Sequence, residues 1–210
     1  MNSIVSLSES REARFWRGLK SGQVAPEQLP QSFSIPAPMM KDMDGHWKRT
    51  SDDPEHKEHG ACIVFDSPVT LRLGDEVVGE SSHAVKPKCR ASEHKDHLGF
   101  FHTHWYLNET EQIGFSHLDF AGVLEDGECL SIVRSGDRVF ALMRTEKSPE
   151  PSPVSKQQEK EFLDVFIYYF RQGLSQDEAC VKANHDLSRR LKFGFYSGRV
   201  SDLLKLEVAP

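Results

Sequence analysis

The sequence lacks the features that would direct the chain to a membrane or to nucleic acid. No hydrophobic run approaches the roughly 20 residues that a helix needs to cross a bilayer, and residues 1–14 contain no basic leader segment. Its 26 basic residues are outnumbered by 32 acidic ones, giving a net charge of −6, whereas phosphate binding requires a basic surface. We therefore expect a cytoplasmic protein that binds neither a membrane nor nucleic acid.

Cysteine is also scarce, and its spacing carries no motif. The 210 residues include four cysteines, none of them paired as C-x-x-C: Cys62, Cys89, Cys129 and Cys180. In a chain without a secretion signal, such cysteines are typical of reduced and mostly buried thiols. The G-x-S-x-G motif and the known catalytic-cysteine signatures are absent as well, so covalent catalysis by serine or cysteine has little support.

The hydrophobic patterns divide the chain into three parts. In the first, residues 1–54, a short helix is expected over residues 7–19. Residues 26–54 are interpreted as an arm or long loop, because their prolines and polar residues follow neither a helical nor a strand period. Residues 55–146 form the predicted core. Residues 147–210 are predicted to be a linker followed by a helical extension.

Within these parts the expected elements alternate between strands and helices. Strands are predicted at residues 61–65, 69–73 and 99–104, a helix at 116–124, a hairpin of strands at 130–134 and 139–143, and helices at 156–171, 175–191 and near 200–206. This order predicts an α/β (α+β) fold, with a mixed β-sheet flanked by helices.

The segment from Gly99 to Asp119 carries the clearest chemical pattern. His102 and His104 close an apolar strand, and residues two apart in a strand point to the same face. The carboxylate of Asp119 would complete three protein ligands, which is the number found in catalytic zinc sites with an open position. Each piece also has an ordinary explanation: two half-buried histidines, and a capping box formed by Ser116 and Asp119 at a helix start.

The motif FHTH of residues 101–104, followed by FSHLD of residues 115–119, resembles the signature of the JAB/MPN (JAMM) zinc metalloproteases in their prokaryotic form. The resemblance covers roughly residues 58–145. It implies a mixed sheet flanked by helices, related to the layer arrangement of cytidine deaminases. The C-terminal helices lie outside it.

The resemblance also implies a role for each motif residue. His102, His104 and Asp119 would hold Zn²⁺, and Ser116 would stabilise the oxyanion of the reaction. A glutamate in front of the first core strand would be the general base, a position that Glu58 fits best. Glu55, Glu76 and Glu80 are the alternatives.

The sequence departs from the family pattern at two points. Eleven residues separate His104 from Ser116, where the family usually has seven, and Trp105 stands where a proline often follows the second histidine. A longer loop costs little chain entropy. Because this loop borders the substrate groove in the family, we interpret the change as altered specificity.

The implied function is that of a peptidase or isopeptidase that cleaves at the C-terminus of a ubiquitin-like protein, with activating and conjugating enzymes as partners in the same pathway. The alternatives are a non-catalytic MPN scaffold and a metal-dependent hydrolase of another substrate class. A homodimer is compatible with the sequence.

Further histidines lie near the motif in sequence: His56, His59, His83, His94, His97 and His117. His94 and His97 have a spacing that could serve a second metal. Without a matching carboxylate or cysteine pair, we interpret all six as surface residues.

Overall fold

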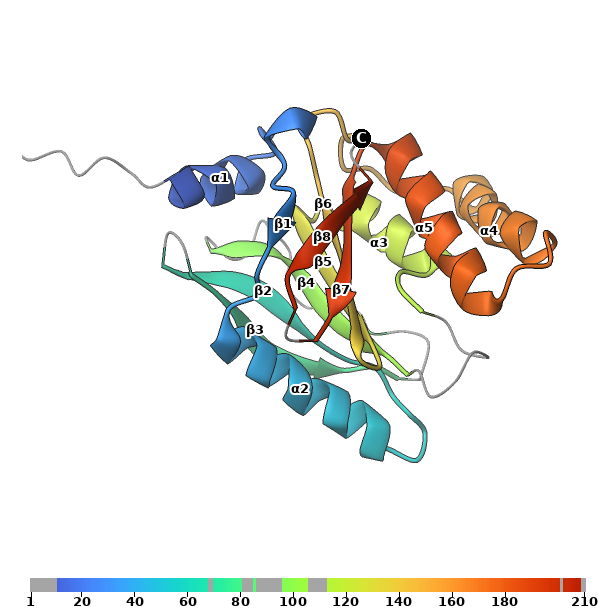
Figure 1. Cartoon of the computed structure of the whole chain (residues 1–210), viewed down its shortest axis with the longest axis horizontal. Helices are drawn as coiled ribbons and strands as arrows, with labels where there is room; N and C mark the ends of the chain where they lie inside the picture. The colour runs from blue at the N-terminus through green and yellow to red at the C-terminus, as the bar shows by residue number, and fades with distance from the viewer. Residues whose placement is uncertain are drawn as a thin grey trace, which may run out of the picture.

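The computed structural model describes residues 11–67, 70–80, 85, 96–105, 113–200 and 202–208. These residues form a mixed α/β fold around one open, eight-stranded sheet, as predicted (Figure 1). The strands lie in the order β1-β8-β7-β6-β5-β4-β2-β3. Their bounds are β1 (Ser32–Phe33), β2 (His59–Ser67), β3 (Thr70–Val78), β4 (His97–His104), β5 (Leu130–Ser135), β6 (Arg138–Met143), β7 (Gly194–Arg199) and β8 (Leu204–Val208).

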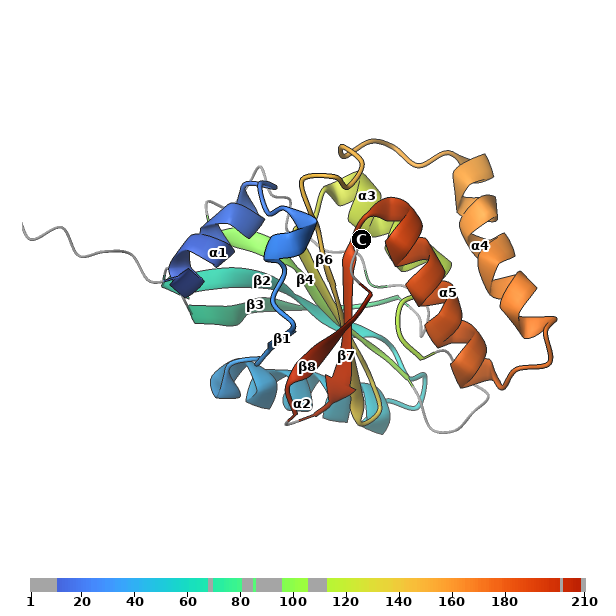
Figure 2. The same cartoon turned by 45° about the horizontal axis from the view of Figure 1, so that its top comes forward.

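Helices cover both faces of this sheet. The described residues contain α1 (Arg11–Lys20), the 3-10 turn η1 (Pro26–Gln28), α2 (Ala37–Asp52), α3 (His117–Asp126), α4 (Lys156–Phe170) and α5 (Gln176–Leu191). The two C-terminal helices α4 and α5 pack together, away from α2 (Figures 1 and 2).

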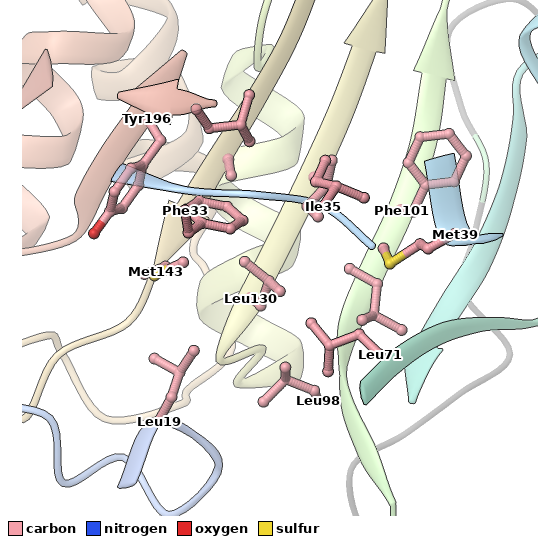
Figure 3. Packing of buried hydrophobic residues seen from close by; sticks show 14 of the residues in the cluster. Leu19, Phe33, Ile35, Met39, Leu71, Leu98, Phe101, Leu130, Met143 and Tyr196 are labelled. Atoms are coloured by element: carbon pink, nitrogen blue, oxygen red, sulfur yellow. The ribbon is translucent and has the colours of Figure 1, made fainter. Parts of the chain in front are cut away.

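Two hydrophobic cores result from the alternation of side chains along the strands. Ile132 belongs to the core under α1 and α2, while its neighbour Val133 belongs to the core under α3, α4 and α5. Figure 3 shows part of the first core, where Phe33, Leu130 and Phe101 gather from separate strands. Every residue of β4 is buried, so this strand lies between both cores.

The connection from β4 to β5 positions the motif. β4 pairs in parallel with β5, whereas the other strand pairs of the described residues are antiparallel. A parallel pair needs a crossover, and α3 lies in it. Ser116 caps the start of α3 and Gly127, with φ 69°, ends it. The carboxyl end of β4 therefore faces the N-terminus of α3, an arrangement at which α/β proteins commonly bind ligands.

The predicted strands, hairpin and two long C-terminal helices are confirmed, but the interpretation of residues 26–54 as an arm or loop is wrong. They contain β1 and the 16-residue helix α2. The prolines suggested a loop, but they lie at the start of α2. Pro36 is the N-cap and Pro38 lies in the first turn, where no intrahelical N–H is needed. The buried positions of α2 do follow a helical period: Met39, Met43, His46 and Thr50.

The helix predicted near residues 200–206 is also wrong, because this stretch turns from β7 into β8. Residues 204–208 alternate apolar and polar side chains, the period of a strand. Tyr196 of β7 pairs with Leu206 of β8, and Phe33 of β1 pairs with Leu204. Both ends of the chain thus add strands to the sheet that holds the motif.

The cysteines differ from the prediction at one position. Cys62 is disulfide-bonded, while Cys129 and Cys180 are free thiols; Cys89 lies outside the described residues. The four cysteines therefore give no support for a reducing compartment. Of the helices that the structure describes, none is both long and apolar enough to cross a bilayer.

The contact between β4 and β5 depends on a glycine, which yields a first prediction. A Cβ atom on Gly99 would lie 1.6 Å from the carbonyl oxygen of Leu130. We expect Gly99→Ala to separate the parallel pair and to lower the free energy of unfolding by about 3 kcal/mol. Gly122→Ala in α3 is the control, because its Cβ would meet nothing within 4 Å and should stabilise the helix slightly. Urea denaturation measures both, and equal stabilities would contradict the expectation.

Candidate metal centre

Three donor groups converge at the edge between β4 and α3. The Nε2 atoms of His102 and His104 lie 3.1 Å apart. The Asp119 carboxylate places Oδ1 3.0 Å from Nε2 of His102 and Oδ2 3.3 Å from Nε2 of His104. Two nitrogen ligands of a tetrahedral zinc ion, each about 2.05 Å from it, stand about 3.3 Å apart. The three residues therefore already have the mutual spacing of metal ligands.

The ring orientation of His104 also fits a metal ligand. Its Nδ1 donates a hydrogen bond of 2.8 Å to the carbonyl oxygen of Gly114, so the lone pair of the neutral ring lies on Nε2, facing the centre. Nδ1 of His102 is buried and has no hydrogen-bond partner among the described residues. A single N–H on His104 Nε2 can point at His102 or at Asp119, whereas a central cation would contact all three groups.

The charges of Asp119 and the two histidines at this centre depend on one another. Burial would raise the pKa of Asp119, but His102 and His104 outweigh it and hold the pKa well below the usual value. Burial would lower the pKa of His104, but the carboxylates of Asp119 and Glu58 outweigh it and raise the pKa to about 9. Without a metal, a proton on His104 thus balances the buried carboxylates at neutral pH.

Glu58 stands at the same centre, just before β2 begins. It is 4% exposed, and its Oε1 lies 3.5 Å from Nε2 of His104. Burial raises the pKa of Glu58, although the two histidines oppose that shift. Its carboxylate and the two imidazoles form a group compact enough to hold a metal ion. Glu58 can therefore be either a fourth ligand or the base beside a three-ligand site.

The three alternative glutamates lie elsewhere. Glu55 pairs with Lys57 at 2.7 Å and is exposed, and Glu80 is exposed. Glu76 pairs with two other histidines across the sheet. Of these four carboxylates, only that of Glu58 pairs with His104 among the described residues, and its role as the base stays a prediction.

Ser116 and Asp119 form the capping box that the sequence allowed, and Asp119 also faces the histidines. The Ser116 hydroxyl accepts a hydrogen bond of 3.1 Å from the backbone N–H of Asp119, and Oδ2 of Asp119 accepts one of 2.6 Å from the backbone N–H of Ser116. The two interpretations are thus compatible. The positive end of the α3 dipole stabilises the Asp119 carboxylate where it meets the imidazoles.

Thr103, between the two histidines, points to the opposite face and joins three elements. Its Oγ1 lies 2.6 Å from Oγ1 of Thr50 in α2. The same atom accepts a hydrogen bond of 3.0 Å from the backbone N–H of His59 and donates one of 3.2 Å to the carbonyl oxygen of His59. The backbone next to Glu58 is therefore fixed against the backbone that carries His102 and His104.

An asparagine of α5, which sequence reasoning missed, holds the backbone that leads into α3. Oδ1 of Asn184 accepts a hydrogen bond of 2.8 Å from the N–H of Phe115, and Nδ2 donates one of 2.8 Å to the carbonyl oxygen of Phe115. Gly114 adopts φ +74° directly under this side chain, a conformation suited to glycine. Asn184 is 69 residues away in sequence, so no local pattern points to it.

The interpretation of the additional histidines as surface residues is wrong for two of them. His59 and His97 are buried, while His56 and His117 are partly buried. His83 and His94 lie outside the described residues, so the His94–His97 pair is not described. Residues 106–112 of the lengthened loop lie outside them as well.

The aromatic residue after the second histidine has a structural role. The Trp105 ring stacks on His56, with centroids 3.7 Å apart, and on Trp47 of α2 at 5.9 Å. Trp105 therefore joins the end of β4 to α2 where the family often has a proline.

Comparison with known proteins adds no relative. A scan against protein-family models finds none that matches the chain, and a search of curated proteins finds no significant match. The likeness to JAMM proteases therefore rests on the sequence motif alone.

Replacing Asn184 tests whether α5 positions the centre. Asn184→Leu should leave the buried N–H and carbonyl of Phe115 unpaired and lower the free energy of unfolding by about 3 kcal/mol. By displacing Gly114 and Ser116, it should also weaken zinc binding at least tenfold, as supporting residues around metals do. Zinc affinity is measured by competition with a chelator.

Ser188→Ala is the matched control, because Ser188 lies one turn along α5, is fully buried and has no hydrogen-bond partner for its hydroxyl among the described residues. Equal zinc affinity in Asn184→Leu and Ser188→Ala would show that α5 does not position the centre.

Proposed function

We propose that this chain is a zinc-dependent peptidase or isopeptidase. The observation that carries the proposal is the convergence of His102, His104 and Asp119 within 3.0–3.3 Å of one another, beside the buried carboxyl group of Glu58. Two imidazoles and one carboxylate match the donor set of catalytic zinc sites. A buried carboxyl group with a raised pKa beside such ligands is typical of functional sites.

The chain's own residues would divide the chemistry among them. When bound, zinc supplies Lewis acidity and lowers the pKa of water towards about 7. Glu58 would take the proton from the attacking water and deliver it to the leaving amine, and its raised pKa suits both steps. The Ser116 hydroxyl, which accepts from the N–H of Asp119, would donate its own hydrogen to the developing oxyanion.

The proposed substrate is the C-terminal tail of a ubiquitin-like protein, with activating and conjugating enzymes as pathway partners. This part rests on the JAMM resemblance. The position of β3 supports it: β3 is the last strand of the sheet, and the N–H of Gly79, directly after it, donates to the carbonyl oxygen of Glu58 at 2.7 Å. An extended tail that paired with this edge, where no further strand of the described residues lies, would run toward Glu58.

Two substitutions test the roles of ligand and base. His104→Ala should lose bound zinc and all cleavage of a ubiquitin-like fusion protein. Glu58→Gln should keep zinc but reduce cleavage by at least about 100-fold, because the amide cannot accept the proton. Zinc is measured by elemental mass spectrometry and cleavage by gel assay. Loss of zinc from Glu58→Gln would instead make Glu58 a fourth ligand, and the closed site would then favour a non-catalytic MPN scaffold.

The pH dependence of zinc binding gives an independent test. Because the pKa of His104 is raised to about 9, its imidazole is protonated at neutral pH in the metal-free chain, and zinc must displace that proton. Affinity should therefore rise about tenfold per pH unit between about pH 7 and 8.5 and level off above about 9. Calorimetry in buffers of different ionisation enthalpy should detect about one released proton at pH 7. An affinity independent of pH in this range would contradict the assignment.

A further inference from the structure

A second histidine–carboxylate group lies on the opposite face of the sheet. His46 comes from α2, His59 from β2 and Glu76 from β3. Nδ1 of His46 lies 3.1 Å from Oε1 of Glu76, and Nδ1 of His59 lies 2.5 Å from the same oxygen. All three donor atoms lie within 4.8 Å of one another. Three separate elements thus bring three ligand atoms together in one cluster.

We propose that His46, His59 and Glu76 form a second binding site for a divalent transition-metal ion of the zinc class. Imidazole nitrogens suit zinc, copper, iron and nickel, whereas calcium and magnesium prefer sites made only of oxygen. With three protein ligands the site leaves a position for water. Since it uses none of the residues of the peptidase centre, it stands independently of the proposed function.

A buried nitrogen that makes no well-aligned hydrogen bond among the described residues supports a ligand at this point. His46 is 5% exposed, and its Nδ1 has no hydrogen-bond partner of adequate geometry among the described residues. Such a group is costly to bury. The edge of the Phe101 ring, with centroids 5.6 Å apart, packs against His46 and fixes its plane.

The guanidinium of Arg49 pairs with the same carboxylate oxygen of Glu76. Its Nε lies 2.7 Å from Oε1 of Glu76, and its side chain is 48% exposed. The guanidinium balances the Glu76 charge and competes with a cation for the same oxygen. Because it reaches this oxygen from the solvent side, it can turn away when a metal binds. In a metal site, Arg49 would thus weaken metal binding. In a purely hydrogen-bonded network, Arg49 would only stabilise the Glu76 carboxylate.

The site would act as a clamp between α2 and the sheet. α2 contributes His46 and Thr50 toward the strands that carry His59 and Thr103. Few backbone hydrogen bonds can link a helix to a sheet, so an ion between His46 and His59 would fix α2 by coordination. We therefore expect a structural contribution to stability from this ion.

Metal counting tests the proposal. The full chain, stripped with a chelator and titrated with Zn²⁺, should bind two equivalents. His46→Ala and Glu76→Gln should each bind one, His104→Ala one, and the His46→Ala/His104→Ala double variant none. His185→Ala is the control and should bind two. Nε2 of His185 is also buried without a hydrogen-bond partner among the described residues, but its ring forms no ion pair with a carboxylate there.

Arg49→Gln supplies the readout that a hydrogen-bonded network would not produce. Removing the competing charge should tighten the second zinc equivalent about tenfold and leave the first unchanged. With Co²⁺ in place of zinc, the visible absorption assigned to the second equivalent should vanish in Glu76→Gln, which preserves side-chain size if His46→Ala folds poorly.

The two proposals fail separately. A wild-type chain that binds one zinc, lost in His104→Ala and retained in His46→Ala, would overturn the second site and leave the peptidase centre intact. If His46→Ala loses one zinc equivalent and His104→Ala loses none, the peptidase centre is overturned and the second site is supported. An unchanged affinity of the second equivalent in Arg49→Gln would also count against the second site.

Discussion

The carboxylate of Asp119 is the interaction on which the rest of the site depends. It accepts the N–H of Ser116 and so begins α3, and the same two oxygens face the imidazoles of His102 and His104. An uncompensated carboxylate in such a buried place would be costly. The helix dipole, the backbone N–H and a cation at the imidazoles, whether proton or metal, compensate it together. Helix start and candidate metal centre are therefore one electrostatic unit.

Segments far apart in the chain support this unit. Asn184 of α5 holds Phe115 by two hydrogen bonds, and Thr50 of α2 contacts Thr103 between the histidines. The parts outside the JAMM resemblance are thus integral to the site. Their strands also join its sheet, since β1, β7 and β8 extend the same hydrogen-bonded order.

Local patterns explain what the sequence could predict. His102, His104, Ser116 and Asp119 lie within one strand–helix crossover, so their spacing alone indicated a common site. Asn184 and His46 carry no local signal of their contacts, because their partners lie in other elements. α2 was missed because prolines at its start resemble those of a loop, although buried residues at helical spacing were present. β8 was missed because five residues are too few to separate a strand period from a short helix.

The two histidine clusters share a backbone, and this has a mechanical consequence. Glu58 and His59 are neighbours whose side chains reach opposite clusters. The backbone of His59 is fixed on both its N–H and its carbonyl by Thr103, which lies between His102 and His104. Any ion that fixes the ring of His59 therefore also restricts the residue that positions Glu58. Packed interiors transmit small displacements because they contain few voids. A cation between α2 and the sheet would therefore hold Glu58, the proposed base, at a constant distance from His102 and His104.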